Sequence, residues 1–128
     1  MKILPEDILS LKKKYPGYIA MVHPECRYEA KAAADEVLST GQMMRYVRES
    51  AAPGFIIGTE TGILHRLKKE NPAKYFVPVT DKAVCLNMKR ITLEKVLWSL
   101  QDMKHQIIVP EDIRVRALNS VERMLAIP

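Results

Sequence analysis

The stretch that decides the fold is Ile19-Ala20-Met21-Val22, and the polar cluster His23-Pro24-Glu25-Cys26 follows it directly. Four consecutive apolar residues, without the alternation of a half-exposed strand, indicate a short β-strand that is buried on both faces. Helical patterns stand on either side of this strand. Pro5 opens a helix that ends at Pro16-Gly17, and an alanine-rich helix is predicted over residues 27–35.

Strand and helix signals continue to alternate beyond this first strand. Short apolar runs predict three more strands, at Val37-Leu38, Phe55-Ile56-Ile57 and Tyr75-Phe76-Val77. Ser39 has Gln42 three residues later, which is the capping-box spacing at the start of a helix. Alternation at this pace predicts an α/β fold, with a small parallel sheet and right-handed crossover helices.

The chain divides into three predicted parts. Residues 1–17 are expected to be a helix left from a preceding domain, residues 18–90 the α/β domain with the polar clusters, and residues 91–128 a C-terminal helical extension. The extension contains two amphipathic helices, one capped by Thr92 and one opened by Pro110. Because their apolar faces have no partner in the α/β pattern, we expect an exposed apolar patch that promotes association.

Composition is typical of an ordinary globular protein. The 128 residues are 48% hydrophobic and 27% charged, and no apolar run is long enough to span a bilayer. The first residues lack the apolar stretch of a signal peptide, so we expect a cytoplasmic protein with no membrane partner. The net charge of +5 is spread along the chain without an aromatic-interleaved basic motif, which favours small anionic ligands over nucleic acid.

The two cysteines, Cys26 and Cys85, are too far apart in the sequence for a CxxC redox or zinc pair. Local spacing also provides no four-ligand metal site around either of them. On composition alone both are small hydrophobic residues of the kind that is usually buried. A metal site would therefore need ligands from elsewhere.

Polar or chemically reactive residues follow each predicted strand at its carboxyl end. Ligands of open parallel sheets bind outside these ends, so the clusters are predicted to converge on one edge. In chain order the four clusters are His23-Pro24-Glu25-Cys26, Ser39-Thr40-Gly41, Gly58-Thr59-Glu60-Thr61-Gly62, and the Cys85 loop with Lys89.

Taken singly, each cluster also has a structural explanation. A histidine after a strand is often a hydrogen-bonded structural residue, and Glu25 could cap the following helix. Ser39 suits a helix N-cap, although the same helix start offers N–H groups to an anion. Gly58 and Gly62 could serve turn geometry alone. The residues by themselves leave both interpretations open.

The ordered set of motifs resembles quinolinate synthase, and in particular the C-terminal portion of that family. The resemblance runs from about Pro5 to the end of the chain, in the family's order and spacing. It rests on the four clusters, on Cys85-Leu86-Asn87-Met88-Lys89 followed by Ile91-Thr92-Leu93, and on the closing Val121-Glu122-Arg123-Met124-Leu125.

The resemblance implies a transferase of de novo NAD biosynthesis, which condenses iminoaspartate with dihydroxyacetone phosphate to make quinolinate. It also implies three similar α/β domains around a central site. A 4Fe-4S cluster would be held there by three cysteines, one from each domain, with one iron position open to substrate. The missing N-terminal domains of the same enzyme are therefore expected partners, because one thiolate does not hold a cluster alone.

Residue by residue, the resemblance gives Cys85 the role of a cluster ligand and gives Cys26 none. His23 and Glu25 match the pair that faces substrate and transfers protons. Further matches to substrate-binding residues are Ser39, Thr40 and Thr59, whereas the motif residues Glu60 and Lys89 have no assigned role.

Two alternatives to a catalytic role stay open. The chain could be a non-catalytic module that binds a small anion at Ser39-Thr40, or an inactive remnant of the enzyme. The presence of Cys85 together with Lys89 favours the catalytic interpretation, because an anion-binding module needs neither. In every case the isolated chain is expected to be colourless and inactive.

Overall fold

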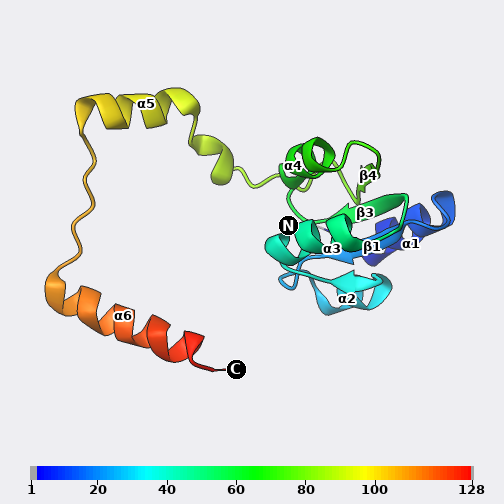
Figure 1. Cartoon of the computed structure of the whole chain (residues 1–128), viewed down its shortest axis with the longest axis horizontal. Coiled ribbons are helices and arrows are strands. Elements are labelled where there is room, and N and C mark those ends of the chain that lie inside the picture. The colour runs from blue at the N-terminus through cyan, green and yellow to red at the C-terminus, as the bar shows by residue number, and fades with distance from the viewer. Residues whose placement is uncertain (1–2, 128) are drawn as a thin grey trace. The chain divides into compact units, whose positions relative to one another are not determined.

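The computed structural model describes residues 3–127 and divides them into two units. The first unit ends at Met88, and the second begins at Lys89. In Figure 1 the first unit, coloured blue to green, has a sheet with helices around it, whereas the second consists of helices joined by extended chain. The assignment of residues 1–17 to a preceding domain stays a prediction.

The first unit is built on a four-stranded parallel sheet in the order β2-β1-β3-β4. Its strands are β1 (Ile19–Val22), β2 (Glu36–Val37), β3 (Gly54–Gly58) and β4 (Tyr75–Pro78). The central strand β3 is buried at every residue, which suits a continuous apolar run covered on both faces. The predicted α/β fold, with a small parallel sheet and a helical extension, is confirmed.

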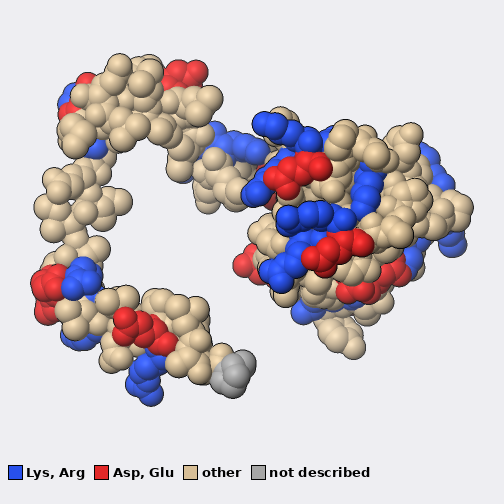
Figure 2. Space-filling view, viewed as in Figure 1, with Lys and Arg blue, Asp and Glu red and all other residues tan. Residues whose placement is uncertain are grey.

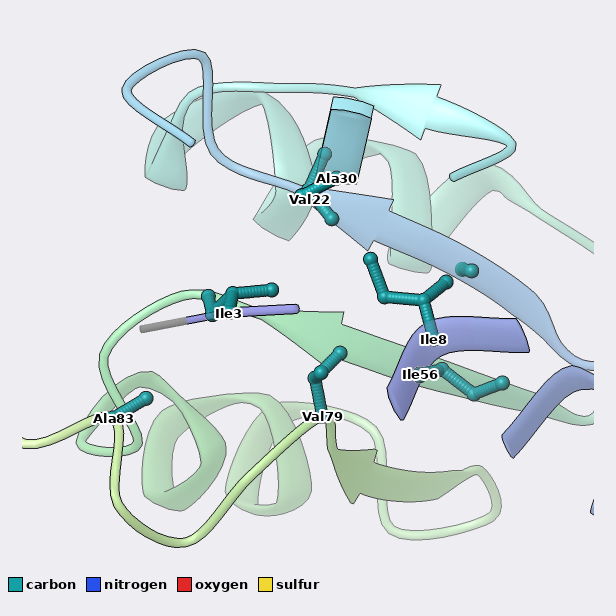
Figure 3. Close-up of a cluster of buried hydrophobic side chains, with 8 residues drawn as sticks. Ile3, Ile8, Val22, Ala30, Ile56, Val79 and Ala83 are labelled. Carbon is teal, nitrogen blue, oxygen red and sulfur yellow. The ribbon is translucent and has the colours of Figure 1, made fainter. Parts of the chain in front are cut away.

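Two pairs of helices give the sheet its two cores. The helices are α1 (Pro5–Lys14), α2 (Tyr28–Ala33), α3 (Thr40–Glu49) and α4 (Ile63–Glu70). Neighbouring side chains of a strand point to opposite faces. Accordingly Ala20 and Val22 of β1 join the core cluster of α1 and α2, and Met21 joins that of α3 and α4. Figure 3 shows the first cluster, which includes Ile3, Ile8, Val22, Ala30, Ile56, Val79 and Ala83.

Two polar side chains connect elements that are distant in the sequence. Asp35, in the turn before β2, forms an ion pair with Lys12 of α1 and accepts the Ala20 N–H of β1 at 2.8 Å. Lys74 donates to the Val47 and Ser50 carbonyls at the end of α3, where the negative end of the helix dipole also favours a cation. These contacts fix the outer helices and turns to the sheet.

The second unit has no core of its own among the described residues. It contains α5 (Leu93–Asp102) and α6 (Glu111–Leu125), and a short 3₁₀ helix (Met88–Arg90) spans the border between the units. Every described residue from Lys89 onward is exposed except Ser99, which is half-buried. The predicted cap at Thr92 is present, because its side chain accepts the Lys95 N–H. The run at residues 107–109 is extended, without strand pairing in the described chain.

On the face shown in Figure 2, acidic side chains lie among the basic side chains of the first unit. No helix formed by residues 3–127 has both the length and the apolar character needed to cross a bilayer.

Candidate active site at the carboxyl edge of the sheet

The carboxyl ends of the central strands are in register. Val22, the last residue of β1, pairs with Val37 of β2 and with Gly58 of β3. The hydrogen-bond ladder extends one step further, because the His23 N–H donates to the Gly58 carbonyl at 3.1 Å and the Leu38 N–H donates to the Val22 carbonyl at 2.9 Å. Three predicted site residues lie just beyond the strand ends at this edge: His23, Ser39 and Thr59.

His23 and Glu25 form a contact pair within one turn. The Cys26 N–H donates to the His23 carbonyl at 2.9 Å and closes the turn. Within it the Glu25 N–H donates to His23 Nδ1 at 3.3 Å, and Glu25 Oε2 lies 3.8 Å from the same nitrogen. The His23 side chain is 21% exposed and that of Glu25 is 86% exposed. A half-buried imidazole beside a solvated carboxylate has the geometry for proton exchange with a ligand.

Cys26 is oriented toward the sheet. Its Sγ donates to the Gly58 carbonyl at 3.5 Å, and its side chain packs against the core cluster of α1 and α2. Burial raises the pKa of the Cys26 thiol above its ordinary value, although a backbone hydrogen bond between His23 and the thiol acts in the opposite direction. A metal ligand must be a thiolate, so this environment disfavours metal binding at Cys26.

The start of α3 provides hydrogen-bond donors close to the same edge. The Ser39 N–H donates to the Gln42 side chain at 2.8 Å, and Ser39 Oγ accepts the Gln42 N–H at 3.4 Å, which confirms the predicted capping box. Thr40 and Gly41 occupy the first turn, where helix N–H groups lack intrahelical acceptors. A Cβ placed on Gly41 would meet nothing within 4 Å. This helix start is therefore sterically open.

Thr59 is the residue directly after β3 and is only 6% exposed. Its place at the carboxyl end of β3 puts it beside the edge where ligands of parallel sheets bind. The neighbouring Glu60 has a structural contact, because its Oε2 accepts the Gly62 N–H at 2.7 Å within the turn that leads into α4.

The loop that carries Cys85 is attached to the β3 end of the sheet. The Thr61 N–H donates to the Ala83 carbonyl at 2.9 Å, and Ala83 is 1% exposed within the first core cluster. Cys85 follows this anchor by two residues and is half-buried. In the described chain no group of three or more His, Cys, Asp or Glu side chains is placed to hold a metal ion. The described residues therefore do not form a complete metal site, and the ligand role of Cys85 stays a prediction.

Two main-chain carbonyls that anchor the predicted site loops were missed by sequence reasoning. The Gly58 carbonyl anchors both His23 and Cys26, and the Ala83 carbonyl anchors Thr61. Both are main-chain groups that contact residues distant in the sequence, so no side-chain pattern reports them. The nearest signal is the glycine at position 58, because a Cβ there would lie 2.6 Å from Val22 Cγ1.

Comparison with known proteins identifies the family. The family model described as "Quinolinate synthetase A protein" matches residues 1–126. A protein of Dehalococcoides mccartyi named quinolinate synthase is 55% identical over 126 residues, which cover 98% of this chain and 42% of that relative. The quinolinate synthase of Thermodesulfovibrio yellowstonii is 49% identical over 125 residues, which cover 98% of this chain and 41% of the relative.

The likeness extends to archaeal proteins. Quinolinate synthase 1 of Methanosarcina acetivorans is 45% identical over 126 residues, which cover 98% of this chain and 41% of the relative. The chain therefore spans about two fifths of the length of these relatives. A family match over nearly all of its residues, with identities near one half, shows that the chain belongs to the quinolinate synthase family.

Proposed function

We propose that this chain supplies one of the domains around the active site of a quinolinate synthase, a cytoplasmic transferase. The complete enzyme would condense iminoaspartate with dihydroxyacetone phosphate to make quinolinate. The observation that carries the proposal is the arrangement at the carboxyl edge of the sheet. A His23–Glu25 pair, a sterically open helix start at Ser39 and the buried residue Thr59 follow neighbouring strands there.

His23 and Glu25 would transfer protons during the condensation. Protons must be gained and lost as a carbon–carbon bond forms and as phosphate and water leave. The two side chains lie within 3.8 Å of each other and differ in exposure, so a proton can pass between solvent and a ligand beside His23. Glu25, at 86% exposed, is the member that can exchange its proton with water.

Ser39, Thr40 and Thr59 would bind the anionic groups of the substrates. The Ser39 oxygen accepts the Gln42 N–H, which leaves the hydroxyl proton for a ligand. The first turn of α3 adds N–H groups and the positive end of the helix dipole. Thr59, directly after β3, would contribute a side-chain hydroxyl.

Cys85 would be one of three cysteine ligands of a 4Fe-4S cluster. Its half-buried position beyond the Ala83 anchor suits a ligand shared with other domains. When bound, such a cluster with an open iron position supplies a Lewis acid. Because the described residues provide no second cysteine suited to the site, the chain alone would not hold the cluster stably.

The remaining domains of the enzyme would also be the structural partners of this chain. The apolar residues of α5 and α6 are exposed. The largest of them, Trp98, is 58% exposed. Surfaces of this kind on a monomer mark sites of interaction. The relatives are more than twice as long as this chain, so the additional residues can supply the partner surface.

A chimera provides the test of this function. This chain would replace the matching 126 residues of the Dehalococcoides mccartyi relative, and quinolinate formation would be measured without oxygen. We expect turnover, which Glu25→Gln lowers about a hundredfold or more. The control, Glu29→Gln, alters an exposed carboxylate on α2 and should leave turnover unchanged.

Measuring substrate-anion binding as well as turnover in the chimera separates the two alternatives to a catalytic role. A chimera that binds the substrate anions but forms no quinolinate would favour the non-catalytic anion-binding module at Ser39-Thr40. A folded chimera with neither binding nor turnover would favour the inactive remnant.

A further inference from the structure

One main-chain carbonyl holds both ends of the turn that carries His23. The Gly58 carbonyl accepts the His23 N–H at 3.1 Å and the Cys26 thiol at 3.5 Å. A carbonyl oxygen has two lone pairs, so it can accept both. Gly58 itself is held tightly, because it is buried at the end of β3 and has Val22 against its Cα. The carbonyl is therefore a fixed point to which the turn is attached.

We propose that Cys26 is a positioning residue for His23. By holding the turn on the Gly58 carbonyl, it keeps the Glu25 N–H on His23 Nδ1, so that the neutral ring carries its proton on Nε2. The proposal rests on the proposed function only in giving His23 a substrate to face, since the hydrogen-bond arrangement belongs to the chain alone.

The tautomer follows from the donor. A backbone N–H can only donate, so the bond from Glu25 N to His23 Nδ1 at 3.3 Å requires an unprotonated Nδ1. In a neutral imidazole the other nitrogen then has the hydrogen. Neutral His23 would meet a ligand as an Nε2–H donor. Glu25, whose Oε2 is 3.8 Å from Nδ1, would then be the group of the pair that accepts a proton.

Cys26 suits this task better than a polar residue would. Its N–H closes the turn on the His23 carbonyl at 2.9 Å, and its side chain packs against apolar residues. A thiol tolerates such surroundings and still provides a weak donor. Burial keeps the thiol protonated, because it raises the pKa of Cys26, and only the protonated form can donate to Gly58.

The first test is ¹⁵N NMR of the histidine rings in the full chain, at a pH where His23 is neutral. We expect His23 to show a protonated Nε2 and an unprotonated Nδ1, and the signal to be assigned by its loss in His23→Gln. Cys26→Ala should shift the ring toward a mixture of tautomers, whereas Cys26→Ser, which keeps a donor, should restore much of the original ratio. Cys85→Ala is the matched control and should leave the ring unchanged.

Two results would overturn the proposal. One is a wild-type His23 with its proton on Nδ1, which can be observed even if Cys26→Ala does not fold. The other is an unchanged tautomer ratio in a folded Cys26→Ala chain. Neither result depends on turnover, so the failure of this proposal is distinguishable from the failure of the proposed function.

A second test uses the chimera. The amide nitrogen of glutamine lies near the position of Nε2, and that of asparagine lies near Nδ1. We expect His23→Gln to retain at least roughly tenfold more turnover than His23→Asn, because it keeps the outward donor. Greater turnover in His23→Asn would contradict the assigned tautomer.

Discussion

The two units of this chain bury their apolar residues to opposite degrees. In the first unit, Phe55, Ile56 and Ile57 are at most 1% exposed between two layers of helices. In the second, the amphipathic helices α5 and α6 expose their apolar residues, with Leu97 at 52% and Leu118 at 44%. Amphipathic helices are stabilised mainly by packing rather than by propensity. We therefore expect the first unit to be stable through its own contacts and the second to be stabilised by a partner.

The largest expected effect is on core packing. Phe55→Ala should lower the free energy of unfolding by about 3–5 kcal/mol, since Phe55 is fully buried and packs on Phe76. Trp98→Ala, its counterpart in α5, should change it by less than about 0.5 kcal/mol. Urea denaturation of the chain would measure both. A large loss from Trp98→Ala in this chain alone would contradict the contrast between the units, whereas in the chimera we expect that loss.

Two glycines of the first unit provide a matched pair with opposite expected signs. Gly58→Ala should cost about 1–3 kcal/mol of stability, because the new Cβ would lie 2.6 Å from Val22 Cγ1. Gly41→Ala should stabilise the chain by up to about 1 kcal/mol, because its Cβ meets nothing and alanine favours the helix.

Gly41→Ala also tests ligand binding at the start of α3. If an anion lies against the first turn of α3, Gly41→Ala should raise KM in the chimera while it raises thermal stability. An unchanged KM would show that no ligand approaches Gly41.

A smaller effect is expected where a lysine stabilises a helix end. Lys74→Met should cost about 1–2 kcal/mol, because Lys74 donates to two carbonyls at the end of α3 and lies 5.7 Å from the Phe55 ring centroid. Lys104→Met removes an exposed ion pair to Asp102 in the second unit and should have almost no effect. Equal losses of stability from Lys74→Met and Lys104→Met would contradict this difference between the units.

The smallest effect concerns pH. The folded state holds the Cys26 proton more tightly than the unfolded chain does, because burial raises the pKa of the thiol above its ordinary value of 9.0. The stability that this provides is complete below pH 9.0 and is lost as the pH rises through the higher folded pKa. Cys26→Ala should therefore lose less stability than the wild type in this alkaline range. The raised pKa of Tyr46 contributes equally to both chains and cancels in the comparison.

Local signals in the sequence predicted most of the first unit. The apolar runs located β1, β3 and β4, and the capping box at Ser39 was present as expected because both of its partners lie within four residues. The convergence of polar residues on one edge followed from the parallel sheet alone. Their assignment to substrate or cluster could not follow from pattern and came from the family resemblance.

The sequence pattern did not predict contacts between residues that are distant in the chain. Nothing near Cys26 in the sequence indicates that its thiol meets the Gly58 carbonyl, and nothing near Ala83 indicates that it anchors the Cys85 loop. Such contacts arise when strands distant in the chain pair in a particular register. They also give the two cysteines different environments, whereas composition alone does not distinguish one cysteine from the other.

The ligand role of Cys85 is tested most directly by the visible absorbance of an iron–sulfur cluster in the anaerobically reconstituted chimera. We predict that Cys85→Ala abolishes the absorbance, that Cys26→Ala retains it, and that the isolated chain is colourless under the same conditions. Cluster absorbance that survives Cys85→Ala, or that is lost only in Cys26→Ala, would contradict the assignment of Cys85 as the ligand that this chain contributes.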